Sequence, residues 1–359
     1  MSAIYALGSN GSGQLGIGHK EDVSVPKGAL FPDSAPQPVV IKAGGNHTLI
    51  LSSTGTVLCA GDYGEGACGL VPDELEESTF MPLKSGLQND VFVTHIAAMW
   101  EASVIVTKDE AGRSTRIYSF GTGHKGELGL GDLIFRTSKA QLIETFPPAG
   151  TQVVDIAASV SHVVVVLCNG DVYGWGNGRK GQLGLPADIV RYPRKIEGLE
   201  FKAAKVACAR EATFLVGAAG NSGHIVLGSD KYRPNLSISE QRMQSCRSIG
   251  ASWSGIFCLL LDGSIMCWGR NDHGQLPPTG LPKLVSMAVG SEHVLGLTET
   301  GDVIAWGWGE HGNCGPGTDA NGDVKDKWNV VASSKFLPPG GKIASIGAGC
   351  ATSWISITA

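Results

Sequence analysis

Long hydrophobic runs are missing from this chain of 359 residues. A membrane-spanning helix needs roughly 20 consecutive apolar residues, whereas the apolar runs here are short, as at residues 163–167. The N-terminus has no basic segment followed by an apolar core, so we expect no secretory signal peptide. Acidic residues outnumber basic ones by 33 to 28, which argues against a surface built mainly for nucleic-acid phosphates. We therefore expect neither membrane association nor direct nucleic-acid binding.

The sequence also lacks the short motifs of common catalytic and cofactor sites. There is no G-x-S-x-G elbow, Walker loop, dinucleotide fingerprint or H-E-x-x-H helix. None of the nine cysteines forms a C-x-x-C pair, so the usual zinc spacing is absent. Most cysteines lie in apolar stretches, and we expect reduced core thiols, as in the cytosol or the nucleus. Cys314 and Cys350 lie in loop-like segments and stay open to reactivity. We predict a protein that is not an enzyme and holds no metal or cofactor of its own.

Glycine, in contrast, is abundant: 51 of 359 residues, about twice the usual frequency. Much of it belongs to an internal repeat, the feature that decides the fold. One sequence motif, which we call the anchor, recurs along the chain. It consists of an apolar residue, then small residues, then a position often filled by His, and then an apolar run. The anchors begin at Ile41, Ile96, Ile156, Val206, Ile249, Met287 and Ile346. Their mean spacing is about 51 residues, within the range of propeller arrays.

A second motif follows most anchors, a short strand and then a Gly-rich loop. Its clearest copies end in Gly-Gln-Leu-Gly or a close variant, at residues 13–16, 126–129, 181–184 and 274–276. Weaker copies lie at residues 66–69 and 312–315, and the fourth unit has lost the motif. Short β-branched runs between Asn-Gly and Asp-Gly turns indicate strands. Short helices are expected only around residues 74–78 and 239–245.

Seven units of about four strands must bury their faces against one another, and a closed ring does this. We therefore predict an all-β fold, a seven-bladed β-propeller formed by residues 1–359 as one domain. The chain starts inside a Gly-rich motif and ends on an anchor. The N-terminal strand is thus expected to complete the last blade and close the ring.

The Gly-Gln-Leu-Gly loops and the anchors resemble the regulator of chromosome condensation repeat family over the whole chain. Segments 4–22, 306–316 and 349–354 resemble its fungal single-propeller branch, which acts in the diphthamide and Elongator pathways. That resemblance implies a heterodimer with a small CSL-type zinc protein that donates electrons, with zinc only in the partner. It also implies roles in making diphthamide on elongation factor two and in modifying wobble uridines of tRNA. Elongator and the diphthamide-synthesis machinery are the further partners that the resemblance implies.

Candidate partner contacts follow from the direction of the strands. Strands alternate within a blade, so the loop entering the innermost strand and the loop after the second strand share one face. We assign the anchor loops to the first set and the Gly-rich loops to the second. Departures from Gly and Ser in the anchor loops are the candidates Trp100, Glu101, Arg210, Glu211, Trp253, Glu292 and His293. The neighbouring Gly-rich loop adds Trp308, Glu310 and His311. Exposed aromatic residues ringed by charge are typical of interface hot spots.

Several alternatives stay open at this point. Trp100 and Trp253 can instead plug the channel or pack between blades. Repetition of His47, His162 and His293 at one position favours a structural role, and the repeated tryptophans at 175, 268 and 306 are expected in blade cores. A Ran-type nucleotide exchange factor is the alternative function; every recognisable Gly-rich loop keeps the same four-residue gap, which disfavours an inserted wedge. A channel-centred enzyme is the third hypothesis.

Overall fold

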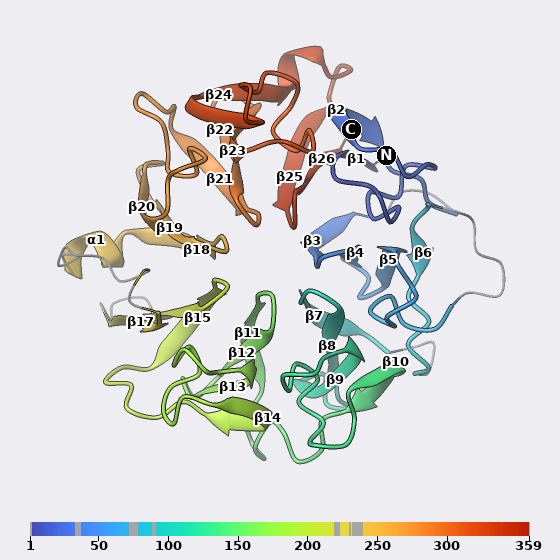
Figure 1. Cartoon of the computed structure of the whole chain (residues 1–359), viewed down its shortest axis with the longest axis vertical. Coiled ribbons are helices and arrows are strands. Elements are labelled where there is room, and N and C mark those ends of the chain that lie inside the picture. The colour runs from blue at the N-terminus through green and yellow to red at the C-terminus, as the bar shows by residue number, and fades with distance from the viewer. Residues whose placement is uncertain are drawn as a thin grey trace.

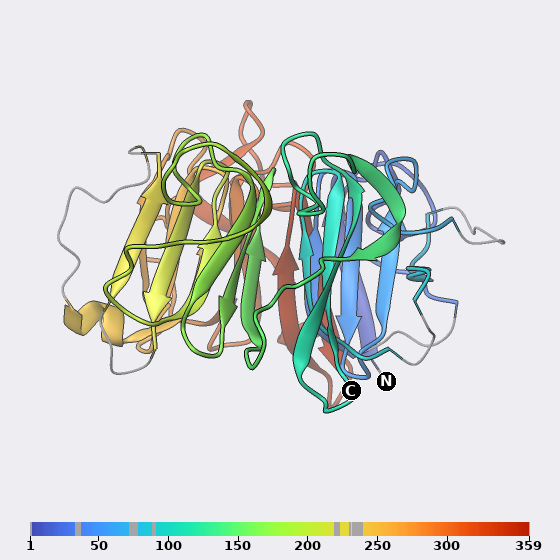
Figure 2. The same cartoon turned by 90° about the horizontal axis from the view of Figure 1, so that it is seen from below.

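The chain forms a ring of seven antiparallel sheets around a central axis, as the computed structural model shows (Figure 1). The structure describes residues 2–32, 37–71, 78–87, 91–218, 223–229, 231 and 240–358. Seen from the side, both termini lie at the same face of the ring (Figure 2). The predicted all-β, seven-bladed propeller is confirmed.

The first four sheets follow one another along the chain, and each is one blade. Blade 1 contains β3 (Pro38–Ala43), β4 (His47–Ser52), β5 (Val57–Gly61) and β6 (Met81–Pro82). Blade 2 contains β7 (Val93–Ala98), β8 (Ala102–Lys108), β9 (Ser114–Thr122) and β10 (Arg136–Leu142). Blade 3 contains β11 (Val153–Ala158), β12 (His162–Leu167), β13 (Val172–Asn177) and β14 (Ile189–Lys195). Blade 4 contains, among the described residues, β15 (Ala203–Cys208), β16 (Ala212–Gly217) and β17 (His224–Gly228).

The remaining three sheets complete the circle. Blade 5 contains β18 (Cys246–Ala251), β19 (Gly255–Leu260) and β20 (Ile265–Gly269). Blade 6 contains β21 (Leu284–Val289), β22 (His293–Thr298), β23 (Asp302–Trp308) and β24 (Asp323–Ser333). Blade 7 contains β25 (Lys342–Ala348), β26 (Thr352–Thr358), β1 (Ser2–Gly8) and β2 (Val23–Gly28). Among the described residues, two short helices lie in connections between blades, α1 (Glu240–Gln244) and the 3₁₀ helix η2 (Ser334–Phe336). Of the two predicted helical segments, 239–245 is confirmed by α1, and 74–78 falls mostly outside the described residues.

Blade 7 is built from both ends of the chain. Its strand order is β2-β1-β26-β25, and β1 pairs with β26 from Ser2 opposite Thr358 to Gly8 opposite Thr352. β1 also buries Ile4 and Leu7 in two hydrophobic clusters. The prediction that the N-terminal strand completes the last blade is confirmed.

The second strand of a blade is covered by a neighbouring blade on both faces. All six residues are buried in β4, β12, β16 and β22. This double coverage explains the short continuous apolar runs of the repeat, because no position of such a strand meets solvent. Trp175 and Trp306 are fully buried, as predicted, and each indole Nε1 donates to a carbonyl of the preceding blade, Glu127 O at 2.9 Å and Gln275 O at 3.0 Å. Trp268 is only partly buried and packs edge-on against Phe214.

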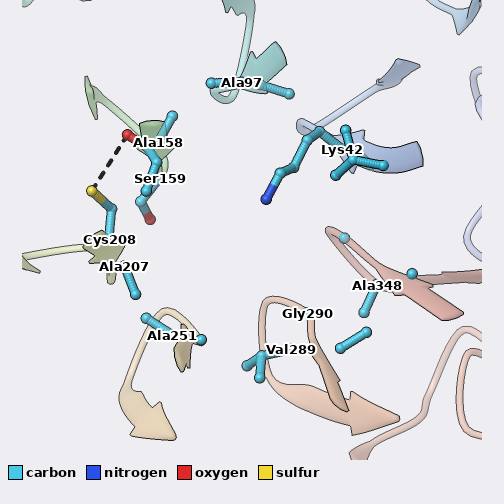
Figure 3. Close-up of a pocket in the computed structure, with 18 of the residues that line it drawn as sticks. Lys42, Ala97, Ala158, Ser159, Ala207, Cys208, Ala251, Val289, Gly290 and Ala348 are labelled. Carbon is cyan, nitrogen blue, oxygen red and sulfur yellow. Dashed lines mark hydrogen bonds between the residues drawn. The ribbon is translucent and has the colours of Figure 1, made fainter. Parts of the chain in front are cut away.

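The innermost strand differs from the one predicted. β3, β7, β11, β15, β18, β21 and β25 surround a central channel of ≈ 650 Å³ (Figure 3). The anchor loop therefore leaves the innermost strand and enters the second one, because the apolar residue that starts each anchor lies on the channel strand. The anchor loops and the Gly-rich loops still share one face, since two strands separate them.

The Gly-rich loops are tight turns fixed by their own side chains. In residues 13–16, Gly13 and Gly16 have φ of 77° and 64°, a backbone region that favours glycine. Gln14 Oε1 accepts the Ser12 N–H at 2.9 Å, and Leu15 is fully buried. Each residue of this loop thus has a local structural role.

Candidate partner-binding site

The anchor histidines join neighbouring blades. Each imidazole Nε2 meets the hydroxyl of a second strand in the next blade: His47 with Ser103 at 2.9 Å, His162 with Thr213 at 3.1 Å, and His293 with Ser353 at 2.9 Å. Ser103 and Ser353 in turn donate to carbonyl oxygens of Ala67 and Asn313. In these two cases the hydroxyl proton is already used, so the imidazole donates its Nε2–H.

The structural role predicted for these histidines is therefore confirmed. The assignment of His293 to the candidate partner contacts must be corrected. Its side chain is fully buried, where a partner cannot reach it. Burial lowers the pKa of His47, His162 and His293 to about 4, so each ring is neutral and can act as a simple hydrogen-bond donor.

A tryptophan pair, Trp100 and Trp253, closes the channel on the face of the anchor loops. The two residues come from blades 2 and 5, on opposite sides of the ring, yet their ring centroids lie 5.7 Å apart. Both line the channel. Trp100 keeps 39% of its surface exposed. The pair is thus both a channel plug and a solvent-facing aromatic surface, so the two interpretations open at the sequence level are compatible.

Backbone hydrogen bonds hold the tryptophan pair in place. Trp100 N donates to Val160 O of the next blade, and Trp253 N donates to Ser291 O. Gly45 N and Arg210 N donate to the carbonyls of Trp100 and Trp253. Because each loop is tied to both neighbours, the aromatic surface is fixed by the ring and is pre-organised for binding.

The charged candidates around the pair divide by exposure. Arg210 is exposed, and its guanidinium carbon lies 5.8 Å from the Trp253 ring centroid, a cation–π arrangement. Glu101 and Glu211 are partly buried. Glu292 is only 8% exposed, and its Oε2 accepts from Ser254 Oγ at 2.6 Å and Gln275 Nε2 at 2.9 Å. Glu292 thus links blades 5 and 6 and offers little to a partner.

A second aromatic group lies further out on the same face. The Trp308 ring meets His311 edge-on at 5.3 Å and lies 6.4 Å from His273. His311 Nδ1 lies 2.7 Å from Asp22 Oδ2. Glu310 is exposed beside them. Trp308, Glu310 and His311 therefore share one surface, as predicted, but they form a group separate from the tryptophan pair.

Sequence reasoning missed Asp22 and His273. Asp22 follows the first Gly-rich motif and reaches blade 6 only because β1 and β2 complete blade 7. His273 precedes Gly274, and the equivalent position holds Ser12, Glu65, Lys125, Lys180 and His311 in other loops. Comparing this variable position across the repeats would have identified His273.

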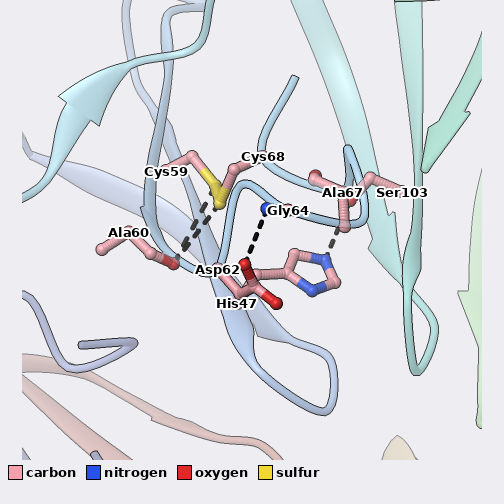
Figure 4. Close-up of a disulfide and its surroundings, with 8 residues drawn as sticks. All are labelled: His47, Cys59, Ala60, Asp62, Gly64, Ala67, Cys68 and Ser103. Atoms are coloured by element: carbon pink, nitrogen blue, oxygen red, sulfur yellow. Dashed lines mark hydrogen bonds between the residues drawn. A yellow bond between two sulfur atoms is a disulfide. The ribbon is translucent and has the colours of Figure 1, made fainter. Parts of the chain in front are cut away.

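The cysteine prediction is wrong in one respect. Cys59 and Cys68 form a disulfide within blade 1 (Figure 4). Cys68 replaces the Leu of the Gly-rich motif, and Cys59 occupies the strand position of Gly174 in blade 3, over which Leu183 packs. The repeat therefore places both cysteines at adjoining positions, a signal that aligning the units would have shown.

The two cysteines left open to reactivity are not activated. Cys314 is buried, and burial raises the pKa of its thiol. Burial likewise raises the pKa of Cys350 to about 11. A thiol reacts as the thiolate, so both are poor nucleophiles at neutral pH.

No group of three or more His, Cys, Asp or Glu residues among the described parts of the chain is arranged to hold a metal ion. Within those same parts, no helix has the length and apolar character that a membrane crossing requires.

The closed ring of seven antiparallel sheets is a seven-bladed β-propeller with aromatic and charged side chains on one loop face. The family comparison gives the RCC1-like domain over residues 3–355, and the chain belongs to this family. Both repeat motifs, the anchor and the Gly-rich loop, agree with this family, because each contributes to packing within the ring.

Two curated relatives match most of this chain. The chain is 33% identical to an RCC1 repeat-containing protein of Schizosaccharomyces pombe, over 99% of this chain and 98% of the relative. It is 28% identical to the secretion-regulating guanine nucleotide exchange factor of Bos taurus, over 89% of this chain and 77% of that protein. Among solved structures, Prp20p of Saccharomyces cerevisiae superposes with a TM-score of 0.80 at 21% identity, covering 99% of this chain and 91% of the other, which shows the shared fold.

Proposed function

We propose that this protein is a non-catalytic propeller that binds a small CSL-type zinc protein on its anchor-loop face. In this proposal the zinc and the electron-donor chemistry belong to the partner, and the pair supports diphthamide formation on elongation factor two and Elongator-dependent modification of tRNA wobble uridines. The resemblance of segments 4–22, 306–316 and 349–354 supports this choice of partner. The heterodimer works in the cytosol and in the nucleus.

The tryptophan pair is the observation that carries the proposal. Two large aromatic side chains meet at the centre of one face, with Arg210 beside Trp253. Trp and Arg are enriched among the few residues that dominate binding energy, and these lie near interface centres. Trp308 and His311 provide a second contact region on the same face.

Binding and folding must be measured separately to test the proposal. Trp253→Ala and Trp100→Ala are each expected to weaken binding of the zinc protein by ~2 kcal/mol or more, roughly thirtyfold, in a calorimetric titration. A tryptophan that only plugs the channel would instead lower the melting temperature and leave the affinity of the folded fraction unchanged. Phe336→Ala is the matched control, because Phe336 is an aromatic residue, 88% exposed, in the connection on the opposite face.

The outer group needs its own variants. Glu310→Ala and His311→Ala test whether the partner reaches the Gly-rich loop of blade 6. Unchanged affinity in these two and in both tryptophan variants would place the interface on the opposite face or on the blade sides. A titration of the intact chain that shows no binding would reject the zinc protein as partner.

Regulation of a small GTPase is the second candidate, because one relative, matched over 77% of its length, is named as a guanine nucleotide exchange factor. Release of a fluorescent guanine nucleotide from purified small GTPases tests it directly. Acceleration by the intact chain, lost in Trp253→Ala, would favour this function over zinc-protein binding.

A further inference from the structure

The central channel contains one residue that breaks the repeat. The register of strand pairing shows which residues of the seven innermost strands are equivalent. The position compared here is the one opposite the third residue of the second strand in each blade. Blade 1 has Lys42 at this position. The other six blades have Ala97, Ala157, Ala207, Gly250, Ala288 and Gly347.

Small residues are required there by the geometry of the ring. The innermost strands converge near the axis, so each blade approaches the next most closely at this point. A Cβ added to Gly347 would lie 3.2 Å from the Cβ of Ile41 in blade 1, and one added to Gly250 would lie 2.7 Å from Val289 Cγ2 in blade 6. A lysine at this position cannot remain between blades, and the Lys42 side chain extends into the channel (Figure 3).

The Lys42 ammonium has no close partner among the described residues. Its interactions with Asp155 and Cys208 are electrostatic only, and burial lowers its pKa, with the Asp155 charge opposing that shift. Asp155 is already engaged, because its Oδ1 and Oδ2 accept the backbone N–H groups of Ile156 at 3.0 Å and Val206 at 2.8 Å. Lys42 is only partly buried, so its ammonium stays accessible from the channel.

The titratable groups Cys208 and His95, which lie near Asp155, carry no negative charge of their own. Burial raises the pKa of Cys208 to about 12, so this thiol carries no charge. Burial also lowers the pKa of His95 and favours its neutral form. The Lys205 Nζ, further around the channel, donates to the Arg247 carbonyl at 2.6 Å. Lys42 is thus available to a ligand in a way that these neighbours are not.

The channel wall can complete a binding site. Each innermost strand is the edge of its sheet, so its outer row of backbone N–H and C=O groups faces the channel without a strand partner. The volume of ≈ 650 Å³ lies within the range of small-molecule sites. The tryptophan pair closes one end. Lys205 and Asp155 also line the channel, but Lys205 is bonded to the Arg247 carbonyl and Asp155 to two backbone N–H groups, so the Lys42 ammonium and backbone N–H donors are left for a small anion.

We propose that the channel binds a small oxyanion, carrying a carboxylate or a phosphate group, through the Lys42 ammonium and backbone N–H groups of the innermost strands that have no strand partner. This site is independent of the partner proposed above. It explains why a charged side chain occupies a position where the repeat otherwise accepts only Ala or Gly.

The test uses the full chain and the probes inorganic phosphate and acetate. Lysines are dimethylated with ¹³C-formaldehyde, and their NMR signals are followed during titration in otherwise anion-poor buffer. Lys42→Ala identifies the Lys42 signal, and Lys27→Ala, an exposed lysine, is the control variant. We expect the Lys42 signal to shift saturably while the Lys27 signal stays in place, and calorimetry to show about tenfold weaker binding in Lys42→Ala.

The outcomes separate the ligand types and the structural alternative. Binding of phosphate alone assigns a phosphate-type ligand, and binding of acetate alone assigns a carboxylate. Lys42→Ala installs the residue of the other blades, so it should fold with unchanged or higher stability. Failure of both anions to move the Lys42 signal would overturn the proposal. Destabilisation by Lys42→Ala with no anion binding in the parent chain would assign Lys42 a structural role instead.

Discussion

Removal of residues 1–8 should unfold the ring as a unit, because β1 is the strand that closes it. The deletion exposes the edge of β26 along the full paired length and separates β2 from its sheet. Ile4 and Leu7 lose their buried positions, at about 1.5–3 kcal/mol each for burial alone. The total, with the lost strand pairing, is about 5 kcal/mol or more and approaches the stability of a typical domain.

Guanidinium unfolding followed by tryptophan fluorescence measures this effect. Trp354 is fully buried and lies opposite Ala6 of β1, so its emission should shift to the red in the truncated chain even before denaturant is added. Leu7→Ala gives a graded version, with an expected loss of about 2–5 kcal/mol. Leu133→Ala is the control, because that side chain is 91% exposed and should change stability by no more than about 0.5 kcal/mol. Identical unfolding midpoints for the truncated and full chains would refute closure through β1.

Three further predictions concern titration, thiols and metal. His47, His162 and His293 have folded pKa values of about 4 against 6.5 unfolded, so stability should fall by about 3 kcal/mol for each as pH drops from 6.5 to 4; a flat unfolding profile in this window, or one that His162→Gln leaves unchanged, would contradict it. Alkylation of the unfolded chain should label seven cysteines without reductant and nine with it, because Cys59 and Cys68 are bonded; nine labels in both would disprove the bond. Elemental analysis should find no stoichiometric zinc in the purified chain, and a value near one zinc per chain would overturn the assignment of zinc to the partner.

The fold was predictable because its determinants are local and repeated. Gly13 and Gly16 specify a turn through backbone conformation alone, and the apolar run of residues 163–167 specifies a strand covered on both faces. The order of strands within a blade was not predictable in this way. The anchor loop and the Gly-rich loop lie on one face whether the anchor loop enters the innermost strand, as predicted, or leaves it, as observed. Only the pairing of β11 with β12 shows which strand lines the channel.

The candidate site depended more heavily on tertiary structure. The sequence indicated that Trp100 and Trp253 are unusual for their loops, but their contact requires two blades on opposite sides of a ring of this size. Glu292 and His293 are polar residues next to each other in the sequence. Their burial follows from bonds to Ser254 and Ser353, which lie in neighbouring blades.

By itself the sequence determined the number of blades, the closing strand and the face on which the variable loops lie, because repetition, turn chemistry and strand alternation are properties of short segments. Tertiary structure alone decided which residues meet. The Cys59–Cys68 bond, the contact of His311 with Asp22 and the direction of Lys42 into the channel all arise where separate segments converge. Distances between such segments are set by the closure and radius of the ring, and no local pattern of residues encodes them.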